Sequence, residues 1–291
     1  MTDIANLQDI LDAYWKDGYV IVPGLLTPEE VTELRGVTQS IEDAAAGFDA
    51  DTPVYDFTAA PDGRRMIERI KKPHRIDEFY WRMARHPKIL AILSAIVGPD
   101  IRLSHSKINM KAPMGGTALE WHQDWAFAPH TNMDTCVASL MVDDSSPDNG
   151  ALQFLSGSHE GALLDHHGPD GFFAGAVGVG DPGVDLATAR SIIGPAGTVA
   201  FHHPMTIHGS GVNMSGAPRR ILFLEYAAVD AYPLFYAVDW DEYEGRIVAG
   251  GGGPGVRIEP HVIKLPLPSP AGSSIYKIQA GLANRHFANA K

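Results

Sequence analysis

The sequence predicts a mainly β protein of the α+β kind, a jelly-roll barrel with helices packed in front of it. Thirty glycines and twenty-one prolines in 291 residues are many for a helical protein and indicate frequent turns. From residue 100 onward, short runs of β-branched and aromatic residues alternate with Gly, Pro, Asn and Asp, which is typical of strands joined by loops. The clearest predicted strands are Ile101–Met110, Cys136–Val142, Ala151–Leu155, Thr198–His202 and Arg219–Tyr226.

The elements before residue 100 are predicted to be mostly helical. Apolar residues recur at helical intervals from Leu7 to Trp15, and a short strand-like run, Tyr19 to Val22, follows. Thr27-Pro28-Glu29-Glu30 has the form of a capping box and predicts a helix over Glu29 to Ala46. Further helix is expected over 77–97, with an interruption at the proline at position 87.

The composition is that of an ordinary globular protein, and the length allows one large domain or two small ones, of which we expect one. We expect a helical part (1–99), a barrel core (about 100–230) and a C-terminal extension (231–291). The longest apolar run, Ile89 to Val97, is too short to cross a bilayer, and a single cysteine cannot form an internal disulfide. Because Met1-Thr2-Asp3 does not open like a signal peptide, we expect a cytoplasmic protein. The formal charge of −12 disfavours nucleic acid and anionic membranes as partners.

A potential metal-binding pattern lies in Trp121-His122-Gln123-Asp124-Trp125. Alternation along a strand would place His122 and Asp124 on one face. The pair alone is weak evidence, but His208, 86 residues later, can supply a third ligand from another strand. Two imidazoles and one carboxylate leave open positions on an octahedral ion, as an iron(II) oxygenase requires. Arg219, on the following strand, has the guanidinium geometry that binds a carboxylate through two hydrogen bonds.

Taken together, these motifs resemble the phytanoyl-CoA dioxygenase family of non-haem iron(II), 2-oxoglutarate-dependent oxygenases. The resemblance rests on His122-x-Asp124, on His208-Gly209-Ser210-Gly211-x-Asn213 and on Arg219, and it runs from about Asp9 to about Asp230. It is supported by Asp17-Gly18-Tyr19, by Pro23-Gly24-Leu25-Leu26 and by the turn from Asn149-Gly150-Ala151-Leu152 to Gly157-Ser158-His159.

The resemblance implies a double-stranded β-helix, a cupin-like barrel, with Fe(II), 2-oxoglutarate and O2 as cofactor and cosubstrates. It implies that iron is bound by His122, Asp124 and His208. It further implies that 2-oxoglutarate chelates the iron and that Arg219 anchors its far carboxylate. Nearby side chains would then be Ser210, Gln123 and, as a weaker candidate, Lys107.

The reaction expected from the resemblance is hydroxylation of an unactivated C–H bond of a small organic molecule, with release of succinate and CO2. In related halogenases a small residue replaces the carboxylate ligand, whereas Asp124 is present here. Desaturation, ring formation and epimerisation remain open. So do two other classes, a non-catalytic metal- or ligand-binding barrel and a zinc hydrolase. The identity of the substrate and the oligomeric state are not predicted.

Other residues are weighed against ordinary structural roles. Arg220 is the second candidate for the anchor, on the opposite face of its strand. The substrate pocket is predicted to include Trp125 and Phe127, which follow Asp124, and Phe172 and Phe173, in a glycine-rich segment (157–185) that is either a lid or a crossover loop. The remaining histidines are expected to be mostly structural or solvated: His130, His166, His167, His202 and His203. A basic run is expected to be a solvated helix face or, less favoured, an anion-binding surface: Arg64, Arg65, Arg69, Lys71, Lys72 and Arg75.

Overall fold

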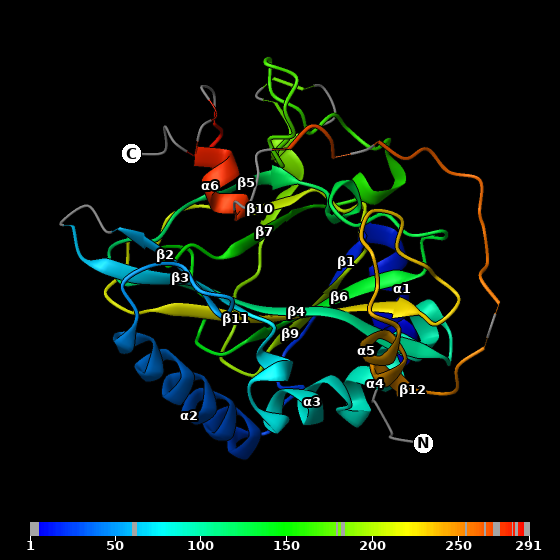
Figure 1. The fold of residues 1–291 in the computed structure, drawn as a ribbon, viewed down its shortest axis with the longest axis horizontal. Coiled ribbons are helices and arrows are strands. Elements are labelled where there is room, and N and C mark those ends of the chain that lie inside the picture. The colour runs from blue at the N-terminus through cyan, green and yellow to red at the C-terminus, as the bar shows by residue number, and fades with distance from the viewer. Residues whose placement is uncertain are drawn as a thin grey trace.

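The computed structural model describes residues 6–59, 63–178, 180–181, 184–253, 255–264, 266–269, 274–280, 282 and 285–287. Two antiparallel sheets face each other, and most helices lie outside the larger one (Figure 1). The fold class is therefore the mainly β jelly roll that the sequence predicts. That the whole chain forms a single domain with the boundaries given above stays a prediction.

In the described part of the chain, four α-helices come before β4 (Ile101–Lys111). They are α1 (Leu7–Asp17), α2 (Pro28–Ala44), α3 (Glu78–Ala84) and α4 (Pro87–Val97). The predicted capping box is present at α2, because the Thr27 side chain accepts from the Glu30 N–H (3.2 Å) and the Glu30 carboxylate accepts from the Thr27 N–H (2.8 Å). The expected interruption before Pro87 separates α3 from α4. Two short helices follow later, α5 (Trp240–Gly245) and α6 (Ile275–Ala280).

The two sheets differ in size. The large sheet has the strand order β1-β9-β6-β11-β4-β3-β2, with β12 also pairing with β4. Its strands are β1 (Tyr19–Val22), β2 (Tyr55–Ala59), β3 (Arg65–Lys71), β4 (Ile101–Lys111), β6 (Thr135–Met141), β9 (Val199–His202), β11 (Arg219–Ala228) and β12 (Ile247–Ala249). The small sheet has the order β5-β10-β7-β8, formed by β5 (Leu119–His122), β7 (Leu152–Leu155), β8 (Ala189–Ser191) and β10 (His208–Ser210).

Strand β11 separates two hydrophobic clusters because its side chains alternate between the faces of the large sheet. Leu222 and Leu224 belong to the core that includes residues of α1 to α4, and Figure 1 shows α2, α3 and α4 beneath this sheet. Ile221 and Phe223 instead pack with Phe154 of the small sheet. The inner face of the large sheet therefore looks into the barrel, and its outer face is covered by helices.

The basic run does not form a helix. Residues 65–71 form β3, which pairs with β2 in a hairpin inside the part of the chain predicted to be helical. Arg69 and Lys71 form ion pairs with the buried Asp56 of β2, at 2.5 and 2.8 Å. The expectation of a helix face is wrong because these charges alternate with the apolar Met66 and with other buried positions at the period of a strand.

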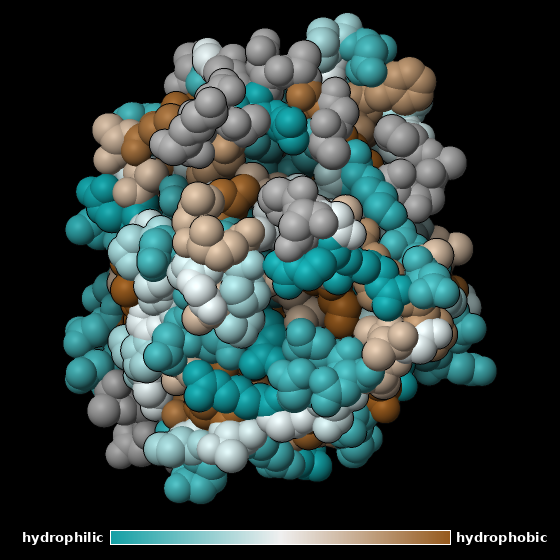
Figure 2. Space-filling model, turned by 90° about the vertical axis from the view of Figure 1, so that its left-hand side faces the viewer, coloured by the Kyte–Doolittle hydropathy of each residue, from teal (hydrophilic) through white to brown (hydrophobic). Residues whose placement is uncertain are grey.

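Two further observations concern the hydropathy of the surface and the length of the helices. Figure 2 views the molecule from the side of β2 and β3, where hydrophilic residues cover most of the coloured surface and hydrophobic ones occupy small separate spots. Among the described residues, none of the helices has the length and apolar character required to cross a membrane.

Candidate metal centre and cosubstrate pocket

Three potential metal ligands converge at one end of the small sheet. His122 is the last residue of β5, His208 is the first residue of β10, and the two are directly opposite each other in the strand pairing. The Oδ1 atom of Asp124 lies 3.8 Å from the Nε2 atom of each histidine. One ligand atom from each of the three residues lies within 4.8 Å of the others, a spacing that one ion can bridge. His122, Asp124 and His208 thus form a possible metal site.

A turn, rather than strand alternation, brings Asp124 beside His122. Strand β5 ends at His122, and Asp124 begins a short 3-10 turn (Asp124–Ala126). The predicted pair is therefore close in space, but the continuous strand that was expected to align it is not present.

Backbone carbonyl groups fix the orientation of both imidazole rings. The Nδ1 atom of His122 lies 2.8 Å from the carbonyl oxygen of Glu120, and that of His208 lies 3.0 Å from the carbonyl oxygen of Thr206. An Nδ1–H that donates to a carbonyl leaves Nε2 unprotonated and free to bind a metal. Both Nε2 atoms face Asp124, so the rings are already in the tautomer and orientation that a ligand needs.

The charges at this centre also suit a cation. Burial lowers the pKa of His122 well below its ordinary value, with a further contribution from His208, and burial lowers the pKa of His208 to about 4. Burial alone would raise the pKa of Asp124, but His208, His202 and Lys107 together hold it well below its usual range. Two neutral imidazoles and one carboxylate are the protonation states that bind a divalent metal.

His202 supports the site although it is not one of the three clustered ligands. It ends β9, is fully buried, and its Nε2 atom lies 3.0 Å from Oδ2 of Asp124. The carboxylate therefore has one oxygen toward the two ligand histidines and the other toward His202. Sequence reasoning treated His202 as an ordinary barrel residue, because Pro204 interrupts the strand before His208.

A cavity of about 650 Å³ adjoins the possible metal site. His122, Asp124 and Phe127 lie in its wall. The opposite wall comes from the inner face of β4 and β11 and includes His105, Lys107, Asn109 and Glu225. Ile275 and Ile278 of α6 complete another side.

An ion pair lies in the cavity wall near the metal centre. The Nζ atom of Lys107 is 2.9 Å from Oε1 of Glu225, and both side chains are partly exposed. Burial alone would lower the pKa of Lys107, but Glu225 and Asp124 raise it; burial alone would raise the pKa of Glu225, but Lys107 and His105 lower it. Both groups therefore carry their charges beside the cavity.

Two buried basic side chains, Arg219 and Lys111, face each other on neighbouring strands of the large sheet. Arg219 is 2% exposed, and its Nε and Nη2 atoms donate to the carbonyl oxygen of Gly150 (3.1 and 2.7 Å). Lys111 lies opposite it in the strand pairing, and its ammonium group donates to backbone oxygens that include Thr117 (2.9 Å) and Ser210 (3.3 Å). Burial lowers the pKa of Arg219 to about 10 and that of Lys111 well below its ordinary value. Among the described residues neither forms an ion pair, so this end of the barrel suits an anion such as a carboxylate.

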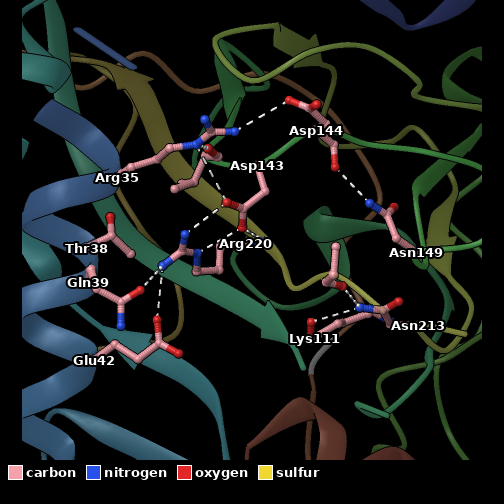
Figure 3. Close-up of polar contacts among 12 residues, drawn as sticks. Arg35, Thr38, Gln39, Glu42, Lys111, Asp143, Asp144, Asn149, Asn213 and Arg220 are labelled. Carbon is pink, nitrogen blue, oxygen red and sulfur yellow. Dashed lines mark hydrogen bonds and ion pairs between the residues drawn. The ribbon is translucent and has the colours of Figure 1, made fainter. Parts of the chain in front are cut away.

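Arg220 points the other way, toward α2. Figure 3 shows its guanidinium between Asp143 on one side and Gln39 and Glu42 of α2 on the other. Its Nε and Nη2 atoms bind the two carboxylate oxygens of Asp143 at 2.8 and 2.9 Å, and Nη1 binds Glu42 at 3.0 Å. The second candidate for the anchor is therefore occupied by acidic partners outside the barrel.

Two predicted site residues have other roles. Every polar contact of the Gln123 side chain is to the backbone: Nε2 donates to Ala162 and Met205, and Oε1 accepts from the Leu164 N–H at 2.9 Å. The fully buried Trp125 packs against His261 and does not line the cavity. The turn after His122 directs both side chains into the surrounding structure, and a cosubstrate contact for Gln123 and a pocket position for Trp125 stay predictions.

The other aromatic predictions divide in the same way. Phe127 lines the cavity, and its ring meets that of His122 edge-on at 5.5 Å. The ring of Phe173 lies 5.0 Å from that of Phe127, whereas Phe172 is 46% exposed and is not among the residues that line the cavity. Phe173 thus contacts a residue of the wall, and the pocket positions of Phe172 and Phe173 stay predictions. Ser210 is buried on β10, two residues after His208, and its cosubstrate role stays a prediction.

Other histidines also have defined places. His130 lines the cavity, and His166 accepts the Gln123 N–H at 2.9 Å, so it is buried and not part of a solvated patch. His203 packs near Trp15 and His159, away from the three ligands.

Asn109 is a residue that sequence reasoning missed. It lies between Lys107 and Lys111 at alternate positions of β4, lines the cavity, and has a buried Oδ1 atom without a hydrogen-bond partner.

Comparisons with known proteins agree with this geometry. Residues 14–221 match the model of the family described as phytanoyl-CoA dioxygenase (PhyH). The chain is 34% identical over 94% of its length, and 97% of the relative's, to a "probable alpha-ketoglutarate-dependent hypophosphite dioxygenase" of Stutzerimonas stutzeri. It is 28% identical over 80% of its length, and 91% of the relative's, to an L-proline trans-4-hydroxylase of Streptomyces griseoviridis. The crystal structure of EctD from S. alaskensis with 2-oxoglutarate and 5-hydroxyectoine has a TM-score of 0.66 at 23% identity, with 89% of each chain covered.

The jelly roll, the possible metal site and these relatives together define a 2-oxoglutarate-dependent dioxygenase that uses Fe(II) and O2. The residues fit both groups, since two histidines present free Nε2 atoms beside an ionised carboxylate and the buried Arg219 forms no ion pair within the described part of the chain. The chain belongs to the phytanoyl-CoA dioxygenase family.

Proposed function

We propose that the protein binds Fe(II) through His122, Asp124 and His208 and hydroxylates a C–H bond of a small organic molecule. The observation that carries this proposal is the carboxylate of Asp124 between two neutral imidazoles at the wall of a 650 Å³ cavity. A carboxylate at this position supports hydroxylation over halogenation. Desaturation, ring formation and epimerisation use the same ligands and are outcomes that product analysis distinguishes.

Bound iron and 2-oxoglutarate supply the oxidising chemistry. One oxygen atom of O2 enters the substrate in place of C–H as C–OH, and the other enters succinate as 2-oxoglutarate loses CO2. The protein's own groups bind, orient and exclude water. Arg219 anchors the far carboxylate of the cosubstrate, and Phe127 shields the metal side of the cavity.

The charges of the cavity support a substrate that carries both signs of charge. Lys107 and Glu225 are 2.9 Å apart and partly exposed to the cavity, so an ammonium group and a carboxylate of a substrate can each find a partner there. The named activities of two relatives, on L-proline and on ectoine, are consistent with a small zwitterionic molecule.

A small phosphorus oxyanion is the second candidate. It is favoured by the relative named as a hypophosphite dioxygenase, which matches at 34% identity. Cationic side chains at the cavity also favour it, namely Arg69, Lys72, Lys107 and Arg246. This candidate leaves much of a 650 Å³ cavity unfilled and gives Glu225 no favourable role, so the organic zwitterion is preferred.

The test is a screen for substrate-dependent succinate formation with the iron-loaded protein. Zwitterionic amino acids, ectoine and hypophosphite would be compared, and the product would be analysed by mass spectrometry after reaction under 18O2. One added 18O atom in an organic product is expected. No product and no succinate from iron-loaded protein would contradict the proposal and favour a non-catalytic barrel, and activity without O2 would favour a hydrolase.

The variant Glu225→Gln distinguishes the two substrate classes. For a zwitterion, loss of the carboxylate should raise KM at least roughly tenfold, the effect of losing one charged hydrogen bond. For an oxyanion, loss of a nearby negative charge should lower KM or leave it unchanged. Glu160→Gln, on the surface 3-10 turn 158–160, is the matched control and should change neither.

A further inference from the structure

The backbone of Glu120 orients one of the three candidate metal ligands. Glu120 lies on β5, two residues before His122, and its carbonyl oxygen is 2.8 Å from Nδ1 of that imidazole. This hydrogen bond leaves Nε2 of His122 unprotonated and directed toward Asp124. The position of this one carbonyl group therefore sets the direction of a metal ligand.

The C-terminal extension holds the main chain at Glu120. Helix α6 packs against β5, which is an end strand of the small sheet (Figure 1). The buried side chain of Gln279 on α6 accepts a hydrogen bond from the Glu120 N–H at 2.8 Å and donates one to the Gly175 carbonyl at 2.5 Å. A side chain of the extension, rather than a neighbouring strand, thus satisfies this backbone N–H.

The Glu120 side chain binds a second part of the same extension. Glu120 is 2% exposed, and its carboxylate accepts hydrogen bonds from the N–H groups of His286 at 2.7 Å and Phe287 at 3.2 Å. The ring of Phe287 lies 5.2 Å from that of Trp121, the residue between Glu120 and His122. The extension therefore contacts Glu120 through both its backbone and its side chain.

The other candidate ligand histidine is held by a different part of the chain. Nδ1 of His208 lies 3.0 Å from the carbonyl oxygen of Thr206, and the Thr206 hydroxyl donates to the Gly18 carbonyl at 2.7 Å. Gly18 directly follows α1, near the N-terminus. Each imidazole is thus oriented by the carbonyl group two residues before it, but only the carbonyl group beside His122 depends on the C-terminal extension. His208 is therefore an internal reference for His122.

We propose that Glu120 is a positioning residue through which the C-terminal extension keeps His122 oriented for metal binding. The proposal rests on the proposed binding of iron by His122, Asp124 and His208. It assigns a role to α6 and to residues 285–287, which lie outside residues 14–221, the part that matches the family model. In this role Glu120 contacts neither the metal nor the substrate. It fixes the carbonyl group that keeps Nε2 of His122 free.

The test measures Mn(II) binding to the full-length protein without O2, by electron paramagnetic resonance of the free ion. In Glu120→Ala two N–H groups of the extension lose their acceptor, and the Kd for Mn(II) should rise roughly tenfold, as is typical when a group that orients a ligand is disturbed. Gln279→Leu removes the contact to the Glu120 N–H and should act in the same direction. Glu120→Gln keeps an oxygen that accepts a hydrogen bond and should bind Mn(II) within about threefold of the wild-type protein.

A second readout separates positioning from a general loss of stability. In the metal-free protein labelled with 15N at histidine, the His122 ring should lose its uniform Nδ1–H tautomer in Glu120→Ala, whereas His208 should keep its own. Tyr55→Phe is the matched control, because the Tyr55 hydroxyl donates to the Ile41 carbonyl at 2.8 Å on the helix-covered side of the sheet. This control should lower the stability in urea and leave the Kd for Mn(II) unchanged.

Unchanged Mn(II) affinity in folded Glu120→Ala and Gln279→Leu would overturn the proposal. Equal losses of affinity in Glu120→Ala, Glu120→Gln and Tyr55→Phe, or equal tautomer changes at His122 and His208, would also contradict it. If the wild-type protein bound no Mn(II), or if Asp124→Ala bound it normally, the proposed function would fail instead, which is a distinguishable result.

Discussion

The small sheet and the inner face of the large sheet supply different parts of the site. The small sheet supplies His122 and His208 where two short paired strands meet. The large sheet supplies charges at alternate positions of two long strands, with Lys107 opposite Phe223 and Lys111 opposite Arg219. The metal site is formed by a few residues at strand ends and in a turn. The charged side chains of the large sheet come together only because β4 pairs in register with β11, more than one hundred residues later in the sequence. The predictions below test this division.

The largest effect is expected from removing the carboxylate at the end of the small sheet. Asp124→Ala leaves two neutral imidazoles and should abolish Fe(II) binding at micromolar metal, a loss greater than the roughly 10- to 100-fold seen when only an outer partner of a ligand is changed. Metal content and the charge-transfer absorption of the anaerobic 2-oxoglutarate complex measure this. Asp165→Ala, an exposed acid beside His167, is the control, and normal iron binding by Asp124→Ala would contradict the assignment.

The two neighbouring arginines of β11 test the two faces of the large sheet. Arg219→Met should weaken 2-oxoglutarate binding by about 3–5 kcal/mol, the cost of removing one partner from a buried charge pair. Arg220→Met should instead destabilise the fold, since it leaves Asp143 without its bidentate partner, and should leave the affinity for 2-oxoglutarate unchanged. Titration of the charge-transfer band and urea unfolding separate the two effects. The reverse pattern would assign the anchor to Arg220.

The sequence predicts the small-sheet part of the site better than the large-sheet part. His122, Asp124 and His208 belong to short motifs that can be recognised as metal-binding without knowing how the strands pair. Glu225 was missed although a single acid in the apolar run of β11 was a usable signal. Asn109 could also have been found from the sequence, because it lies two residues after Lys107 on the same predicted strand.

Other features had no local signal. The six-residue helix α6 comes more than fifty residues after Arg219, and only the folded chain brings it against β5. The β2–β3 hairpin was hidden because Arg69 and Lys71 form ion pairs with Asp56, so a basic run that looks solvated is half buried. The turn after His122 was likewise hidden, because Trp121 to Trp125 looks like one continuous strand whereas a 3-10 turn begins at Asp124.

His202 links the two sheets and should have an intermediate effect. It lies on β9 of the large sheet and holds the Oδ2 atom of Asp124 at 3.0 Å. His202→Leu should weaken Fe(II) binding roughly 10- to 100-fold, as is typical for residues that orient a metal ligand, without removing a ligand. Metal affinity by competition with a chelator is the measurement. His203→Leu, the next residue, faces Trp15 and should have little effect on metal affinity, so equal losses in both variants would indicate a general packing defect.

The smallest effect concerns His74, which packs against β4 and does not line the cavity at the metal site. Its Nδ1 atom lies 2.5 Å from Oγ of Ser106 on β4, and burial, with smaller contributions from His105 and Arg246, lowers its pKa to about 4 from an ordinary value of 6.5. Because the folded-state pKa is depressed, the unfolded chain binds the proton first as the pH falls. The stability that His74 contributes is complete above pH 6.5 and is lost progressively down to about pH 4. Protonation of this one group should reduce the free energy of unfolding by about 1–2 kcal/mol at pH 5 relative to pH 7.

Urea unfolding of His74→Phe measures this contribution. The variant should be less stable at pH 7 through loss of the Ser106 contact, but its free energy of unfolding should decline less steeply toward pH 5. A decline as steep as that of the wild-type protein would mean that His74 gains its proton in the folded state as readily as in the unfolded one.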